Sequence, residues 1–373
     1  MEIQNHRQPL RRTLEALRNG KLTLGFIGGS VTDGRFFNNW PEPVTAWFVE
    51  RFPDARIVVE NAAIGATGSE LGIFRAKRDL IDRGADLVFV EYAANDNGGS
   101  DERNRRTQEG LIRKLLSAGC DVVLAYIFFQ PMYQDMIAGK VFRTIAAFEE
   151  LAEHYRLGSV WMGKHALNEL MAGKMRWEEW LPDNIHPGHR GSLSYAQPVI
   201  AFLEKELCTR DLAVASKAKA RKPQSAAAFA KLPAPLDKRN WEHCYGLDLA
   251  QVKTVGPWTL RRSLSFVWYD MLLDTSVPGA KLSFDFDGRA LLLGFDFSNN
   301  DAEFVYRLDG GDPVASNRDH PAWYVNSLGW YRTFVIAENL KPGRHHLELE
   351  VIHGDRPDCR GTNFRLALIG VVP

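Results

Sequence analysis

Apolar runs and amphipathic stretches alternate along the first 210 residues of the chain. Five short segments are almost entirely apolar, which is typical of parallel strands covered on both faces; they span residues 21–28, 56–60, 87–92, 122–128 and 159–162. Stretches with helical periodicity lie around and between them, at residues 9–19, 41–51, 69–83, 103–118, 136–155 and 191–207. Strands that alternate with helices predict a three-layer α/β/α domain with a parallel sheet of about five strands.

After residue 240 the spacing of apolar residues changes to a period of two, which is typical of half-buried strands. Residues 281–287 and 346–351 alternate between apolar and polar side chains, and Asp287-Gly288 and Asp309-Gly310 are turn sequences. Short alternating strands with such turns predict an antiparallel β-sandwich of the jelly-roll type.

Residues 211–240 separate the two patterns. They are rich in Ala, Lys and Pro and lack apolar periodicity, which is typical of a linker. We therefore expect a first domain at residues 1–210, a linker at residues 211–240 and a second domain at residues 241–373. The length of 373 residues fits two domains of ordinary size.

Composition and charge narrow the class of protein. Lys plus Arg and Asp plus Glu both number 46, so the formal net charge is zero and no broad basic surface for nucleic acid is expected. No apolar run reaches the ~20 residues of a membrane-spanning helix, and the first residues lack the apolar core of a secretory signal. The four cysteines form no CxxC motif, so we expect neither disulfides nor a metal site. A cytoplasmic protein without membrane or nucleic-acid partners is expected.

Polar residues follow several predicted strands, at the sheet edge where ligands of open parallel sheets bind. The first such segment, residues 25–34 (GFIGGSVTDG), has glycines that allow a sharp turn and expose Ser30 at the start of the next helix. Ser30 could equally serve only as the cap of that helix. The segment is neither a dinucleotide-binding nor a P-loop motif, and Thr32 stands where a GxSxG motif has its second glycine.

Three further segments share this placement. Residues 61–69 (NAAIGATGS) offer backbone N–H groups or a helix cap, and Asn95 offers a carboxamide beside Ser30 or an Asx turn. Asp183 lies three residues before His186, where it can orient the imidazole; a solvated proline-rich turn is the alternative. Each segment alone fits ordinary structure. Together they supply a nucleophile, a base, an orienting carboxylate and oxyanion donors.

The four segments resemble the four sequence blocks of the SGNH/GDSL hydrolase superfamily. The resemblance implies a flavodoxin-like sheet and a carboxylic ester hydrolase, such as an esterase, lipase or carbohydrate deacetylase, that needs no metal and no cofactor. It also implies that Ser30 is the nucleophile, His186 the general base and Asp183 the partner that orients the base.

In the same superfamily, an oxyanion hole is formed by a side-chain amide and two backbone N–H groups. The resemblance assigns these roles to Asn95, to the N–H of Ser30 and to one N–H of the second segment. The chain departs from the usual pattern twice: Gly29 stands where an aspartate is common, and Ala66 stands where a glycine is usual. The second backbone donor is therefore either Gly65 or Ala66.

The combination of these segments with a C-terminal sandwich is similar to that of bacterial carbohydrate O-acetylesterases. This closer resemblance implies a serine esterase that removes O-acetyl groups from oligo- or polysaccharides. Four aromatic residues near the site or in the sandwich are candidates for contact with the acetylated carbohydrate: Trp40, Trp180, Trp323 and Tyr324. A lipase or aryl-esterase of the GDSL type and a catalytically silent carbohydrate-binding protein are the alternatives. The sugar, the position of its ester and assembly into a homo-oligomer are left open.

Overall fold

The computed structural model describes residues 2–34, 39–209, 232–263, 268, 270–298, 300–316, 318, 330–354, 357 and 359–373. The chain divides into two compact units, Met1–Glu242 and His243–Pro373. No helix among the described residues is both long and apolar enough to cross a membrane.

The first unit is built on a six-stranded sheet with the order β1-β6-β5-β4-β2-β3. The five strands from β6 to β3 are parallel, and β1 adds an antiparallel edge. The strands span Gln4–Asn5 (β1), Lys21–Gly28 (β2), Arg56–Asn61 (β3), Leu87–Glu91 (β4), Asp121–Tyr126 (β5) and Gly158–Trp161 (β6). Every residue of β4 and β6 is buried, which explains their continuous apolar sequences.

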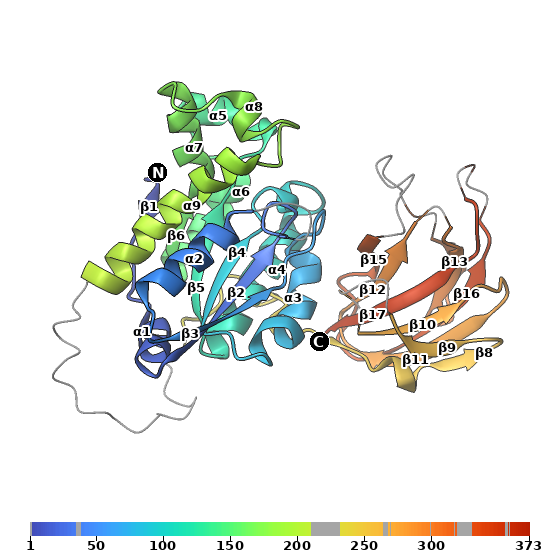
Figure 1. Ribbon diagram of the computed structural model, residues 1–373. Helices are drawn as coiled ribbons and strands as arrows, with labels where there is room; N and C mark the ends of the chain where they lie inside the picture. The colour runs from blue at the N-terminus through green and yellow to red at the C-terminus, as the bar shows by residue number, and fades with distance from the viewer. Residues whose placement is uncertain are drawn as a thin grey trace. The chain divides into compact units, whose positions relative to one another are not determined.

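Helices cover both faces of this sheet (Figure 1). Helices α3, α4 and α6 lie on one face, and α2, α7 and α9 pack against one another on the other. The helices span Arg11–Arg18 (α1), Pro41–Arg51 (α2), Ser69–Ala76 (α3), Asp101–Ser117 (α4), Tyr133–Ile137 (α5), Arg143–Tyr155 (α6), Met162–Met171 (α7), Trp177–Trp180 (α8) and His189–Leu203 (α9). The flavodoxin-like three-layer architecture predicted from the sequence is confirmed.

The strand order places a topological switch point between β2 and β4. From β2 the chain moves outward to β3, and it then returns to the other side of β2 to form β4. The connections that leave the carboxyl ends of β2 and β4 therefore diverge, and a crevice opens between them. The predicted Ser30 and Asn95 segments are these two connections.

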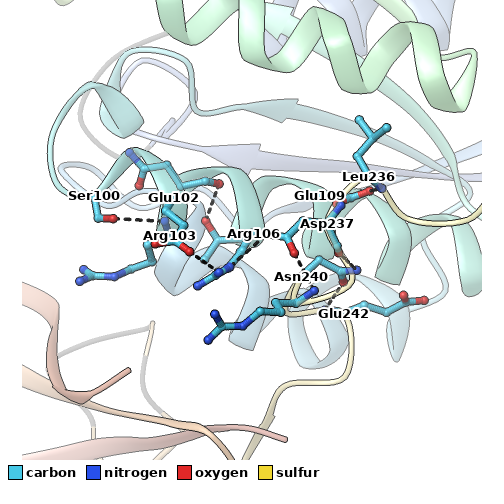
Figure 2. Close-up of polar contacts among 12 residues, drawn as sticks. Ser100, Glu102, Arg103, Arg106, Glu109, Leu236, Asp237, Asn240 and Glu242 are labelled. Atoms are coloured by element: carbon cyan, nitrogen blue, oxygen red, sulfur yellow. Dashed lines mark hydrogen bonds and ion pairs between the residues drawn. The ribbon is translucent and has the colours of Figure 1, made fainter. Parts of the chain in front are cut away.

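Residues 232–242, here called the strap, are attached to the first unit (Figure 2). The carboxylate of Glu109 on α4 accepts the backbone N–H groups of Leu236 at 2.6 Å and Asp237 at 2.8 Å, and the Tyr155 hydroxyl at 2.5 Å. The Arg106 guanidinium pairs with Asp237, and Trp241 is buried. Of the predicted linker, residues 211–231 lie outside the described residues, whereas residues 232–240 are held on α4.

The second unit consists of two antiparallel sheets. One has the order β15-β12-β17-β10-β9, with β7 paired to β17, and the other has the order β14-β13-β16-β11-β8. The first sheet comprises Tyr245–Gly246 (β7), Thr259–Arg262 (β9), Met271–Thr275 (β10), Ala290–Phe297 (β12), Trp330–Ala337 (β15) and Phe364–Val372 (β17). The second comprises Lys253–Val255 (β8), Lys281–Asp287 (β11), Glu303–Leu308 (β13), Val314–Ala315 (β14) and Arg344–Ile352 (β16).

The period of two places the core between these sheets. Leu282, Phe284 and Phe286 of β11 are buried, whereas the residues between them are half-buried or exposed. Leu349 and Leu347 of β16 lie opposite the first two in register and belong to the same apolar cluster. The predicted antiparallel sandwich is confirmed.

Candidate active site

Ser30 lies in a tight turn directly after β2. The Gly29 carbonyl accepts the N–H groups of Thr32 at 3.1 Å and Asp33 at 3.0 Å. The side-chain amide of Asn39 donates to the Ser30 carbonyl at 3.0 Å, which fixes the turn from the other side. The sequence reading, which placed Ser30 at the start of a helix, is wrong on this point, because α2 begins only at Pro41. Ser30 is held by a turn rather than by a helix N-terminus.

His186 and Asp183 lie in the loop between α8 and α9. His186 Nε2 is 2.7 Å from Ser30 Oγ, and His186 Nδ1 is 2.6 Å from Asp183 Oδ2. The other Asp183 oxygen accepts the backbone N–H groups of His186 at 2.7 Å and Ile185 at 3.1 Å. Burial alone would raise the pKa of Asp183, but these hydrogen bonds outweigh it and lower the pKa below its ordinary value. The carboxylate therefore stays ionised and oriented toward the imidazole.

A neighbouring aromatic residue supports this loop. The Trp177 indole N–H donates to Asn184 Oδ1 at 3.1 Å, and Asn184 lies between Asp183 and His186 in the sequence. Asn184 has φ of 70°, the left-handed conformation that asparagine tolerates better than most residues. The loop conformation that brings Asp183 to His186 is thus fixed by a side chain of α8.

Asn95 begins a short 3-10 turn, η2 (Asn95–Asn97), after β4. A Cβ built on Gly29 would lie 2.1 Å from Asn95 Oδ1, so the carboxamide occupies the space directly beside the residue that precedes Ser30. Asp96 fixes η2, because its buried carboxylate accepts the Ser69 N–H at 2.9 Å and the Gln108 amide at 2.8 Å. Gly29, which stands in place of the usual aspartate, therefore leaves room for the Asn95 side chain.

The second segment presents one of its two candidate N–H groups. The Gly65 N–H donates to the buried Asp33 carboxylate at 3.2 Å. Within the described ranges, the Ala66 N–H makes no hydrogen bond, and Ala66 is exposed with φ of 56°. This left-handed conformation is one that glycine adopts without strain. The backbone of residue 66 thus keeps a conformation suited to glycine although the residue is alanine.

Comparison with known proteins concerns the family and the fold. Residues 26–192 match the model of the GDSL-like lipase/acylhydrolase family. The matched residues lie within the first unit, which is therefore similar to this family. The match confirms the family and the enzyme class expected from the sequence, a carboxylic ester hydrolase. No curated protein is similar enough in sequence to match the chain.

Solved structures similar to this GDSL-like protein include chains with two domains. A two-domain esterase (CEX) active on acetylated mannans, co-crystallised with mannopentaose, has a TM-score of 0.78 at 22% identity, covering 98% of this chain and 96% of its own. A second structure of a CEX esterase has a TM-score of 0.77 at 23% identity, covering 97% and 94%. The acetylxylan esterase Axe2 of Geobacillus stearothermophilus covers 50% of this chain and 94% of its own, at 20% identity and a TM-score of 0.40.

Two of the four aromatic residues predicted to contact substrate are buried in the core of the first unit. Trp40 and Trp180 are both 0% exposed, so neither presents a surface to a ligand, which corrects the prediction for these two. Trp40 packs edge-on against Phe26 and Phe89 of the sheet, and Trp180 packs against Phe128 and Tyr195. Trp323 and Tyr324 lie outside the described residues.

Sequence reasoning assigned no role to Glu91, the last residue of β4. Its side chain is 0% exposed beneath the Ser30 turn, and Glu91 Oε2 accepts the Thr32 hydroxyl at 2.9 Å and the Gly29 N–H at 3.3 Å. Burial, reinforced by the charge of Asp96, raises its pKa to about 8 against the hydrogen bonds that lower it. The feature of the sequence that could have indicated a role for Glu91 is a carboxylate at the end of an otherwise apolar strand.

Proposed function

We propose that this chain is a serine esterase that removes O-acetyl groups from oligo- or polysaccharides. The observation that carries the proposal is the chain of contacts from Asp183 to His186 to Ser30, with both inter-residue distances below 2.8 Å. A hydroxyl, an imidazole and a carboxylate in this order form an activated nucleophile. In this proposal Ser30 attacks, His186 is the general base and Asp183 holds the imidazole in the productive tautomer.

The reaction follows from these positions. His186 accepts the Ser30 proton as Oγ attacks the acetyl carbonyl, and the carbonyl oxygen becomes an oxyanion. The Asn95 amide and the backbone N–H groups of Ser30 and Ala66 stabilise that charge, Ala66 rather than Gly65 because the Gly65 N–H is already donated to Asp33. His186 then protonates the leaving sugar oxygen. Water, activated by the same imidazole, hydrolyses the acetyl-enzyme.

The substrate class is supported by the whole-chain likeness to esterases active on acetylated mannans. That likeness spans the hydrolase unit and the sandwich together. An acetylated carbohydrate is therefore the substrate that we propose. No metal or cofactor is required by the steps above, because the side chains supply the nucleophile, the proton transfers and the oxyanion donors.

Acetate release tests this proposal. Purified full-length protein is incubated with acetylated mannan, xylan and pectin fragments, and with p-nitrophenyl acetate and decanoate. We expect release of acetate from at least one glycan and a preference for the acetate ester. Preference for decanoate would favour a lipase, and no turnover of any ester would favour a silent binding protein.

Two serine variants complete the experiment. Ser30→Ala should lower kcat by roughly 10²-fold or more, because the covalent route is lost. Ser117→Ala, an exposed serine on α4, is the control and should behave as the wild type. Near-normal turnover of Ser30→Ala would reject the assignment of the nucleophile.

A further inference from the structure

Glu91 is joined to both sides of the nucleophile turn. In the parallel pairing of β2 and β4, Gly28 is the register partner of Glu91. Glu91 Oε2 accepts the N–H of Gly29, which precedes Ser30, and the hydroxyl of Thr32, which follows it. One carboxyl oxygen thus binds both Gly29, one residue before Ser30, and Thr32, two residues after it.

The Glu91 carboxyl is closely packed against the backbone of β2. A Cβ on Gly28 would lie 2.9 Å from Glu91 Oε2 and 2.6 Å from the Glu91 carbonyl oxygen, so backbone and carboxyl are in close contact. The Trp40 indole N–H donates to Thr32 Oγ1 at 3.1 Å. Because one lone pair of Thr32 Oγ1 accepts the Trp40 N–H, the Thr32 hydroxyl directs its own proton to Glu91. Trp40 is itself fixed by packing, as described above.

The chemistry of the site favours a neutral carboxyl. The second oxygen, Oε1, is buried and has no hydrogen-bond partner among the described residues. The titratable groups that interact with Glu91 in the described ranges are anionic or neutral: Asp96 on η2, and the hydroxyls of Tyr92, directly after β4, and of Tyr195 on α9. Within the part of the chain that the structure describes, Glu91 forms no ion pair, and the guanidinium of Arg75 pairs with Asp79. A buried carboxylate without a cation is unstable.

We propose that Glu91 is a positioning residue of this esterase: its neutral carboxyl holds the Gly29–Thr32 turn that presents Ser30, and loss of its proton releases the turn and lowers turnover. The inference rests on the proposed esterase function. Ionisation places an uncompensated charge beneath the nucleophile. The native turn then gives way to arrangements that hydrate the carboxylate, and Ser30 leaves the position in which His186 can deprotonate it.

The pH dependence of kcat tests the inference. For the full-length wild type, kcat for p-nitrophenyl acetate should fall above pH about 8, where Glu91 loses its proton. Glu91→Gln keeps the shape and the neutral state, so it should retain wild-type kcat near neutral pH and lack the alkaline fall. Glu91→Ala removes the acceptor of both flanking residues and should lower kcat by roughly 10²-fold at every pH, since misplacement of a reacting group by about 1 Å has that effect.

A matched control and a second readout separate this inference from the proposed function. Asp121→Asn replaces a half-buried carboxyl, bonded to Thr13 at the amino-terminal edge of the sheet, and should keep the alkaline fall of the wild type. Infrared spectroscopy should show a protonated carboxyl band whose loss above pH about 8 is smaller in Glu91→Gln than in the wild type, because Asp301 loses its proton in the same range in both proteins. An alkaline fall that persists in an active Glu91→Gln protein would overturn the inference alone. A wild type that releases no acetate from any ester would instead reject the proposed function.

Discussion

Ala66 holds a backbone conformation that residues with a Cβ adopt only at a cost. Its φ is 56°, and its N–H is the proposed oxyanion donor. Ala66→Gly removes a strain of about 1–2 kcal/mol, whereas the added freedom of the unfolded chain opposes this by roughly 0.5–1 kcal/mol. We expect the free energy of unfolding in urea to rise by up to about 1 kcal/mol, with kcat for p-nitrophenyl acetate almost unchanged.

Ala66→Val provides the comparison at the same position. A β-branched side chain resists positive φ more strongly than alanine does, so this variant should lower both the stability and kcat. A loss of kcat in Ala66→Gly that equals the loss in Ala66→Val would contradict the assignment of this N–H, since glycine keeps the donor in place.

Gly29 and Asn95 act as one unit if the carboxamide stabilises the oxyanion. Asn95→Ala should lower kcat by roughly 10²–10³-fold. Gly29→Ala should also lower it, because the new Cβ would lie 2.1 Å from Asn95 Oδ1 and displace the amide. A double-mutant cycle on kcat checks the coupling: the double variant should be no slower than Asn95→Ala alone.

Gly98→Ala is the matched control for the glycine substitution. Gly98 follows the same 3-10 turn, has φ of −99°, and has open space where a Cβ would stand. It should leave kcat unchanged. Additive losses in the Gly29 and Asn95 variants would show that the glycine acts on something other than the carboxamide.

Residue types indicated the site because each has a narrow chemical use. Ser30, Asn95 and the pair Asp183 and His186 were predicted from three separate loops, and the structure brings Ser30, His186 and Asp183 into direct contact. The choice between Gly65 and Ala66 could not be made from sequence, because it depends on where the Asp33 carboxylate lies in space.

At the scale of elements, the parallel strands were predictable because burial on both faces leaves long apolar runs. The elements that were not predicted are either very short or follow the preceding element without a turn sequence. Strand β1 has two residues and α8 has four, and α7 begins directly after β6 without a turn sequence. The burial of Trp40 was also not predicted, since this residue follows the Ser30 turn in sequence but packs against Phe26 and Phe89 of the sheet.

The strap shows how a segment without periodicity can still be ordered. Glu109→Ala removes the acceptor of two backbone N–H groups and of the Tyr155 hydroxyl. Unsatisfied donors are costly, so the free energy of unfolding of the full-length protein should fall by about 2–3 kcal/mol. Glu102→Ala, on the same helix, removes an exposed partner of Arg106 and should cost under about 1 kcal/mol. Equal losses in urea titrations of the two variants would contradict the role of Glu109.

At the scale of the whole molecule, each unit buries a carboxyl group whose pKa is raised. Glu91 is such a group in the first unit, and Asp301, whose pKa is raised by burial and by the nearby charge of Asp296, is one in the second. Both carboxyl groups have ordinary pKa values of about 4 when the chain is unfolded. The native protein therefore binds more protons than the unfolded chain above that pH, and the free energy of unfolding must decrease as the pH rises.

This linkage predicts a loss of stability in both units between pH about 4 and pH about 8, where the native Glu91 carboxyl also ionises. Hydrogen exchange resolved to peptides of each unit measures it separately for the two. Glu91→Gln should flatten the pH dependence of the first unit only, and Asp301→Asn that of the second only, because each variant removes the proton whose release drives the change. If neither substitution altered the slope of its own unit, other groups would have to carry the proton uptake, and the neutral state assigned to the buried carboxyls would be wrong.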